Sequence, residues 1–276
     1  MNMQTLVKLA LEEDAARGDV TTNALVPRDA RASAVFVAKE GGIICGLAAA
    51  KEVFRQLDKK TVFRPLVADG ARVKKYRQFA SVSGSARALL SGERTALNIL
   101  RHLSGISTFT GLFVSAVRGK TKIFDTRKTT PLFRELEKYA VRCGGGFNHR
   151  FNLSDMALIK DNHLIAADLR NFTAASLRSR FKNIPVEIEA QNFSQVKLLV
   201  KLSPDIILLD NMDYGLMKRA IKYIRDNSGC EIEISGNVNP VSAARYASLR
   251  PDRISVGKIT HSAPNLDISL EFRKMR

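Results

Sequence analysis

Hydrophobic and polar positions follow a mixed helical and strand-like pattern over the first 119 residues. Apolar residues at helical spacing predict helices over residues 3–16, 48–58 and 93–119. Runs rich in apolar and β-branched residues predict strands over residues 31–47, divided by a Gly-Gly turn, and within residues 70–85. We expect Gly18 to end the first helix and Ser104-Gly105 to kink or divide the long third one.

After residue 119 the pattern becomes a repeat in which short apolar runs alternate with helical segments. The six apolar runs predict strands within residues 121–126, 156–162, 186–190, 205–211, 231–237 and 252–258. Helical segments separate them, one of them expected near residues 167–180. This alternation predicts parallel strands with helices outside, in a barrel or a doubly wound sheet. Nearly every run ends in a polar or glycine cluster, which favours a barrel whose strand ends share one functional rim.

Composition narrows the class of protein. The chain has 276 residues, 45% hydrophobic and 26% charged, as expected for one large or two modest globular domains. Three widely spaced cysteines form no CxxC pair, which argues against a disulfide scaffold or a Cys-rich zinc site. No apolar run is long enough to span a bilayer, and no signal peptide is recognisable. We therefore expect a cytoplasmic protein without membrane association.

The charge balance points to anionic partners. Lys and Arg number 44 against 27 Asp and Glu, and the excess of +17 is spread along the chain. A dispersed excess is compatible with nucleic acid or with small polyanionic substrates. Trp is absent and aromatic residues make up only 7%, which disfavours a nucleic-acid reader built on base stacking.

A group of cationic residues follows consecutive predicted strands. The segments DTRKTTP, RCGGGFNHR and IKDNH contribute Arg127, Lys128, His149, Arg150 and Lys160. Any one of these alone is best read as a surface charge, and His149 alone as a core histidine. Together on one rim they suit a ligand with two adjacent carboxylates, because Arg binds carboxylate bidentately and Lys acts as a point charge.

Acidic and glycine-containing segments lie on the same predicted rim. Glu189 and Asp210 could hold Mg²⁺ through substrate oxygens and waters, or stabilise a positively charged transition state. Glu187 and Glu231 fit structural pairing with Lys or Arg equally well. The last two predicted strands end in Ser235-Gly236-Asn237 and Ser255-Val256-Gly257, a position where barrels often bind phosphate. His261 is expected to cap or support this loop.

At these residues the sequence closely resembles the quinolinate phosphoribosyltransferase family. The resemblance runs from GDVTT at residues 18–22 to LDISL near the C-terminus and includes GERTALNILRHLSGIST, DTRKTTP, EKYAVRCGGGFNHR, LIKDNH, LLDN and SVGKITHSAP. It implies an α/β fold with an N-terminal α/β sandwich over residues 1–105 and an open, incomplete α/β barrel of TIM-like type over residues 106–265. The segment 266–276 is expected to return to the sandwich.

The resemblance also implies a glycosyltransferase (pentosyltransferase) of de novo NAD biosynthesis. The expected reaction joins quinolinate to 5-phosphoribosyl 1-diphosphate and yields nicotinate mononucleotide, diphosphate and CO₂ with Mg²⁺. Family members form homodimers, some of which assemble further, to hexamers for example, and we expect no nucleic-acid partner. Two alternatives stay open: a divergent paralogue of the molybdate-operon type, and a nicotinate phosphoribosyltransferase that does not decarboxylate.

Matching motifs assign roles to particular residues. Lys128, Lys160, Glu189 and Asp210 are the expected catalytic residues, the last two near the metal through substrate or water. The expected substrate-binding residues are Arg94, which reaches the neighbouring subunit's pocket, with Arg127, Lys128, His149, Arg150, Lys160, Glu189, Asp210, Ser235, Gly236, Asn237, Gly257 and His261. Asn237 stands where many members have glycine, and Asn tolerates the left-handed conformation better than most residues.

Overall fold

The computed structural model describes residues 2–166 and 171–275. The chain forms two compact units, each built from more than one stretch of sequence. The first unit contains residues 1–111, 129–145 and 259–276, and the second contains residues 112–128 and 146–258. Helix α4 (Ala86–Val117) contributes residues to both.

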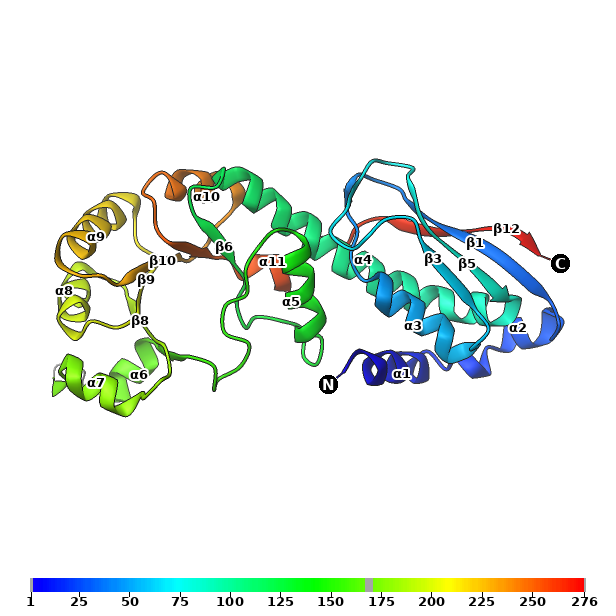
Figure 1. Ribbon diagram of the computed structural model, residues 1–276, viewed down its shortest axis with the longest axis horizontal. Coiled ribbons are helices and arrows are strands. Elements are labelled where there is room, and N and C mark those ends of the chain that lie inside the picture. The colour runs from blue at the N-terminus through cyan, green and yellow to red at the C-terminus, as the bar shows by residue number, and fades with distance from the viewer. Residues whose placement is uncertain (1, 167–170, 276) are drawn as a thin grey trace. The chain divides into compact units, whose positions relative to one another are not determined.

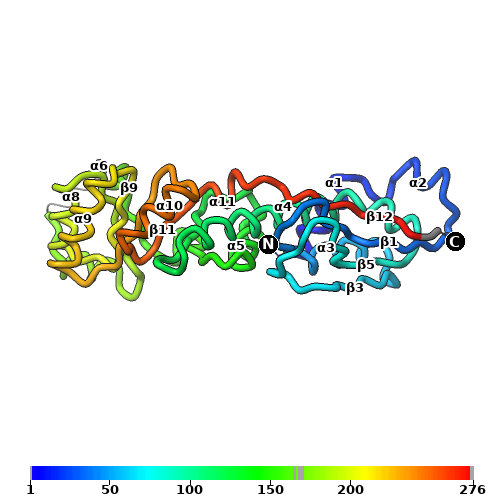
Figure 2. The backbone as a smooth tube through the Cα atoms, turned by 90° about the horizontal axis from the view of Figure 1, so that it is seen from above, coloured from blue at the N-terminus to red at the C-terminus, as the bar shows by residue number. Residues whose placement is uncertain are grey.

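The first unit is built on an antiparallel sheet that the C-terminal strand completes. Its strands are β1 (Arg31–Ala38), β3 (Val62–Pro65), β5 (Gln78–Ser85) and β12 (Ile268–Met275), in the order β12-β1-β5-β3. Strand β12 lies beside β1 along its length, with Val35 opposite Glu271 (Figure 2). Two short strands, β2 (Gly42–Ile43) and β4 (Arg72–Val73), pair with each other, so the Gly41-Gly42 turn does not form a hairpin between β1 and β2.

Helices cover one face of this sheet (Figure 1). They are α1 (Met3–Glu13), η1 (Ala16–Gly18), α2 (Val20–Leu25), α3 (Leu47–Leu57) and the first part of α4. The unit also contains α5 (Arg134–Cys143) and most of α11 (Lys258–His261). Helix α1 ends at Glu13 rather than near Gly18, because the chain turns at Ala15, which has a positive φ, into a separate 3₁₀ turn. Asp19 then begins α2 by accepting a hydrogen bond from the Thr22 backbone N–H at 2.9 Å.

An aromatic cluster forms the core between sheet and helices. The Phe36 ring of β1 lies 6.2 Å from Phe54 of α3, 5.7 Å from Phe63 of β3 and 5.9 Å from Phe79 of β5. Phe36, Phe54 and Phe79 are completely buried. One residue from each of four elements therefore meets in one tilted-ring cluster, a favoured geometry for aromatic side chains.

Helix α4 runs uninterrupted through Ser104-Gly105, where a kink or a break was expected. The glycine is needed for packing instead. A Cβ at Gly105 would lie 3.0 Å from the Asn265 Cα and closer still to the Pro264 carbonyl oxygen. The absence of a side chain lets the segment before β12 pass directly over the helix.

The second unit is an open parallel α/β barrel, as predicted. Its six strands are β6 (Lys122–Phe124), β7 (Ala157–Ile159), β8 (Val186–Ala190), β9 (Ile206–Asp210), β10 (Glu231–Ser235) and β11 (Arg253–Ser255). All neighbouring pairs are parallel, in the order β6-β11-β10-β9-β8-β7. Strands β6 and β7 form the two edges, and each of the six strands falls within a predicted apolar run.

Helices lie outside the curved sheet of this unit (Figure 1). They are α6 (Asp161–Ala166), α7 (Ala174–Arg180), α8 (Phe193–Leu202), α9 (Tyr214–Asn227) and α10 (Pro240–Ala247). The helix expected near residues 167–180 is represented by α7, while residues 167–170 lie outside the described part of the chain. None of the described helices of either unit combines the length and the apolar character needed to cross a membrane.

Candidate active site

The carboxyl ends of the parallel strands bring most of the predicted site residues to one rim of the second unit. Arg127 and Lys128 follow β6, Lys160 follows β7, and Gly257 lies two residues after β11. Glu189, Asp210 and Ser235 stand at the carboxyl-terminal ends of β8, β9 and β10. Arg94 and His261 belong to the first unit, so the described geometry of the rim does not include them.

His149 is the most tightly held of these residues. Its Nε2 lies 2.8 Å from the Glu187 Oε2 and 3.4 Å from the Glu233 Oε2, and its backbone N–H donates to the Asp125 Oδ1 at 2.8 Å. The imidazole is only 6% exposed. Burial disfavours its charged form, but the hydrogen bond to Glu187 and the nearby Glu233 carboxylate outweigh burial and raise the pKa of His149 to about 9. The side chain is therefore an imidazolium at neutral pH.

The two carboxylates that hold His149 lie inside the barrel. Glu187 on β8 and Glu233 on β10 are 0% and 1% exposed. Burial and the neighbouring carboxylate of Glu233 raise the pKa of Glu187, while His149 opposes that shift. Arg253 on β11 adds positive charge nearby, because its Nε lies 3.9 Å from the Glu233 Oε2.

Glu231 pairs with an arginine, the structural interpretation that the sequence left open, whereas Glu187 pairs with a predicted site residue. Glu187 pairs with His149, and Glu231 pairs with the Arg253 guanidinium. Glu231 is the first residue of β10, and its side chain is 52% exposed. It therefore stands at the opposite end of the strand from the rim.

Lys160 and Glu189 form a charged pair at the rim. The Lys160 Nζ lies 3.6 Å from the Glu189 Oε2, and the Gln191 side-chain amide donates to the Glu189 Oε1 at 3.0 Å. Lys160 is 47% exposed, whereas Glu189 is only 6% exposed. A fixed carboxylate thus supports an accessible ammonium group.

The loops after β9 and β10 meet at the same rim in left-handed backbone conformations. Asn211 donates from its side-chain amide to the Asp210 Oδ2 at 2.7 Å, and its backbone N–H donates to the Ser235 carbonyl at 3.1 Å. Gly236 has φ +102°, and a Cβ there would lie 2.8 Å from the Asn211 backbone N. Asn237 follows with φ +45°, the conformation that Asn tolerates. Replacing the common glycine by Asn237 therefore keeps the left-handed turn.

Arg150, the residue after His149, is affected by the positive charge of Arg127. The Arg150 Nη1 donates to the Met156 carbonyl at 3.0 Å. Burial and the positive charge of Arg127 lower the pKa of Arg150. Both guanidinium groups therefore add positive charge to this part of the rim.

Two sets of residues offer ligands for a cation. Glu189 and Asp210 supply carboxylate oxygens at the ends of neighbouring strands, a donor type that Mg²⁺ prefers. His149, Glu187 and Glu233 each offer an atom within 4.8 Å of the others, the one such triad among residues 2–166 and 171–275. Within that triad the His149 Nε2 forms a hydrogen bond with the Glu187 Oε2 at 2.8 Å.

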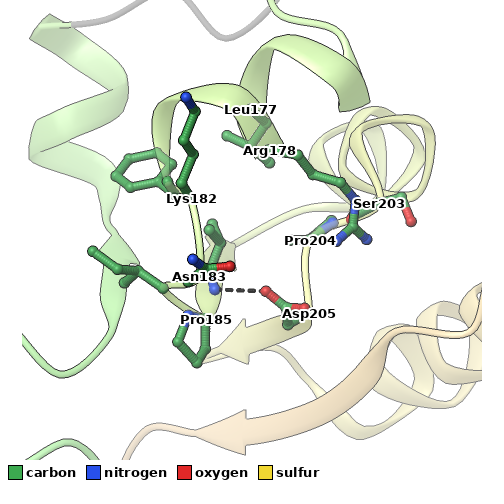
Figure 3. Close-up of a pocket in the computed structure, with 11 residues that line it drawn as sticks. Leu177, Arg178, Lys182, Asn183, Pro185, Ser203, Pro204 and Asp205 are labelled. Carbon is green, nitrogen blue, oxygen red and sulfur yellow. Dashed lines mark hydrogen bonds between the residues drawn. The ribbon is translucent and has the colours of Figure 1, made fainter.

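A cavity of about 550 Å³ lies at the other end of the strands (Figure 3). Its lining comes from the loops that precede β8 and β9 and includes Arg178, Lys182 and Asp205, whose carboxylate accepts from the Val186 N–H at 2.7 Å. None of the predicted site residues lines it. Because barrels carry out chemistry at the carboxyl ends of their strands, we assign the site to the rim and not to this cavity.

Sequence reasoning gave no role to two residues that shape this site, namely Asp125 and Arg253. Asp125 is completely buried and holds the His149 backbone. Glu233 belongs to the Glu-x-Glu pattern that β8 and β10 share, which the sequence does show and in which alternate residues of a strand face the same side.

Comparisons with known proteins agree with this geometry. The chain matches the family models described as quinolinate phosphoribosyl transferase, N-terminal domain, over residues 19–104, and C-terminal domain, over residues 106–271. It is 40% identical over 274 residues to the nicotinate-nucleotide pyrophosphorylase [carboxylating] of Mycobacterium leprae, covering 96% of this chain and 95% of that protein.

Solved structures show the same similarity. The nicotinate-nucleotide pyrophosphorylase of Francisella tularensis superposes with a TM-score of 0.91 at 36% identity, covering 98% of this chain and 96% of that one. The enzyme of that name from Ehrlichia chaffeensis gives a TM-score of 0.91 at 36% identity over 99% of both chains.

Proposed function

This chain belongs to the quinolinate phosphoribosyl transferase family. On that premise we propose which residues bind each substrate and which stabilise the transition state. The reaction transfers the phosphoribosyl group of 5-phosphoribosyl 1-diphosphate to quinolinate with decarboxylation, in de novo NAD biosynthesis. The pyridine nitrogen forms a bond to the anomeric carbon as the bond to diphosphate breaks. The 2-carboxylate then leaves as CO₂, and a proton from solvent replaces it on the ring.

Arg127, Lys128, His149, Arg150 and Lys160 bind the two carboxylates of quinolinate and the charged groups of the donor. Support comes from the positive charge of Arg127 acting on Arg150 and from the buried imidazolium of His149. A dicarboxylate relieves the repulsion between the two guanidinium groups, and each Arg can bind one carboxylate bidentately. Lys128 and Lys160 are exposed at the rim, where they can balance charge on the departing diphosphate.

Glu189 and Asp210 stabilise the positive charge that develops on the ribose ring. Both carboxylates are held by a neighbouring amide, Glu189 by Gln191 and Asp210 by Asn211, which fixes them before substrate arrives. Mg²⁺ bound through these oxygens, substrate oxygens and water would supply charge neutralisation of the diphosphate. Treatment with a chelator should abolish turnover, and added Mg²⁺ should restore it.

The loops after β10 and β11 receive the 5-phosphate. Gly236 and Asn237 have consecutive positive φ values, an arrangement that lets backbone N–H groups approach an anion closely. Ser235 and Gly257 complete this set.

A cytoplasmic homodimer completes the proposal. Arg94 is exposed on α4 and is available to enter the quinolinate pocket of a partner subunit. The support is the match of GERTALN to the family motif.

The observation that carries the proposal is the gathering of cations and acids at the carboxyl ends of one parallel sheet. The test incubates purified protein with quinolinate, phosphoribosyl diphosphate and Mg²⁺, with nicotinate as the parallel substrate. Equal yields of nicotinate mononucleotide and CO₂ from quinolinate alone are expected. Product from nicotinate would overturn the pocket assignment, and no product from either would favour the divergent paralogue.

Subunit sharing has its own test. Inactive Arg94→Ala and inactive Lys128→Ala subunits are mixed and allowed to exchange. Hybrid dimers should regain activity because each contains one site with both intact residues. Exchange without recovery would contradict a shared site.

A further inference from the structure

The loop that carries His149 and Arg150 is fastened to the barrel at several points. The Phe147 N–H donates to the Ile123 carbonyl at 2.8 Å, and the Asp125 N–H donates to the Phe147 carbonyl at 3.0 Å. The Phe147 ring stacks on Phe124 with centroids 5.4 Å apart. These contacts join the loop to β6, one edge of the sheet.

A second attachment reaches across the barrel. The His149 Nε2 meets Glu187 on β8 at 2.8 Å and Glu233 on β10 at 3.4 Å, although neither strand is next to β6. With its backbone N–H held by Asp125 at 2.8 Å, the residue is fixed at both ends. The imidazole can therefore not turn without breaking contacts to buried carboxylates.

These two carboxylates have no role in the chemistry proposed above, yet burying them costs desolvation free energy. Both are at least 98% buried as side chains, and the Glu187 Oε1 and Glu233 Oε2 have no hydrogen-bond partner among the described residues. A pair of apolar residues would fill the barrel interior without desolvating two charges. Their presence calls for an explanation beyond packing.

We propose that Glu187 and Glu233 are positioning residues that orient His149 and, through its loop, place Arg150 to receive the dicarboxylate substrate. The inference rests on the proposed function, because it concerns the quinolinate side of that site. The two glutamates touch no reacting atom. They act through His149, and Arg150 follows it directly in the chain.

The arrangement predicts an effect confined to one substrate. Misplacing an oriented binding group by about 1 Å can lower catalysis about 100-fold. We expect Glu233→Gln and Glu187→Gln to lower kcat/KM for quinolinate roughly 100-fold, mostly by raising KM. The KM for phosphoribosyl diphosphate should change less than about threefold, because Glu189, Asp210 and the 235–237 loop keep their own contacts.

Glu231→Gln is the matched control. It makes the same isosteric change two residues from Glu233 on the same strand, but at the exposed end. It should keep both KM values. Circular dichroism and thermal unfolding of every variant establish that each one is folded.

A double-mutant cycle separates positioning from general stabilisation. Glu233→Gln is made in the wild type and in His149→Ala, and quinolinate binding is followed by calorimetry without the donor as well as by kinetics. If Glu233 acts through His149, it should have little further effect once His149 is absent. An equal effect in both backgrounds would overturn the proposal.

The outcomes also separate this inference from the proposed function. If the wild type makes product and Glu187→Gln and Glu233→Gln, both folded, keep the quinolinate KM, positioning is wrong and the function stands. If the wild type makes no product and binds no quinolinate, the proposed function is wrong. The positioning role, which depends on it, is then wrong as well.

Discussion

Gly105→Ala should destabilise the protein even though it raises the helix propensity at that position. Gly105 lies inside the 32-residue helix α4, where alanine is favoured over glycine by about 1 kcal/mol. Against that gain, the new Cβ would stand 3.0 Å from the Asn265 Cα and 3.1 Å from the Pro264 carbonyl carbon, and nearer still to the Pro264 oxygen. Carbon atoms at rest are about 3.5–4.0 Å apart, so the segment must withdraw by at least roughly 0.5 Å.

This shift of the 264–265 segment disturbs a hydrogen bond and a buried side chain at the next residue, Leu266. The Leu266 N–H donates to the Arg101 carbonyl at 3.0 Å, and Leu266 is buried. Overpacking costs about 1–3 kcal/mol, and a weakened hydrogen bond about 1 kcal/mol more. After subtracting the helix gain, we expect the free energy of unfolding to fall by about 1–3 kcal/mol.

Urea unfolding followed by circular dichroism measures this change, since the chain has no Trp for fluorescence. Gly229→Ala is the control, because a Cβ there meets nothing within 4 Å. That variant should be neutral or gain up to about 1 kcal/mol by restricting the unfolded chain. If Gly105→Ala unfolds at a higher urea concentration than the wild type, the packing argument is refuted. Helix propensity would then outweigh packing at this position.

Three further predictions concern separate parts of the molecule. Asp19→Ala should lose about 1 kcal/mol of stability at pH 7. Hydrogen bonds to the Thr22 hydroxyl and backbone lower the pKa of Asp19, so the difference should fade as the pH falls below its ordinary value of about 3.9. A difference that persists at pH 2 in urea unfolding would contradict that assignment. Phe36→Ala should cost about 3–5 kcal/mol, because the ring is completely buried against three others, and thermal unfolding would show it. Arg127→Ala should lose about 2–4 kcal/mol of transition-state stabilisation, measured as kcat/KM for quinolinate; near-normal kinetics would exclude it from the pocket.

The six parallel strands could be predicted because each one is a short apolar run followed by a polar cluster. Ile207, Leu209, Ile232 and Ile234 show this, since all four are completely buried in strands that end at Asp210 and Ser235. The same pattern placed the candidate residues on one rim. Short elements such as α2 and β3 escaped prediction because a few residues carry too little periodicity.

Contacts between distant segments could not be predicted from local patterns. The sequence around Gly105 does not indicate that Pro264 packs against it, so this glycine was interpreted as a possible kink. The His149–Glu187 contact joins residues 38 positions apart, and a buried glutamate on a strand looks the same in sequence as one facing solvent. Spatial partners, and not spacing, decide the role of such residues.

The position of β12 has a consequence for how the protein is made. Strand β1 is paired on one side with β12. Lys39, which follows β1, forms an ion pair with Glu271 of β12, 232 residues further along the chain. At a synthesis rate of about 5–20 residues per second, β1 waits roughly 10–50 s for its partner. During that interval β1 is an open edge with unpaired backbone groups, a template for pairing with another chain. Crowded ribosomes and slow translation should therefore raise the aggregated fraction of newly made protein.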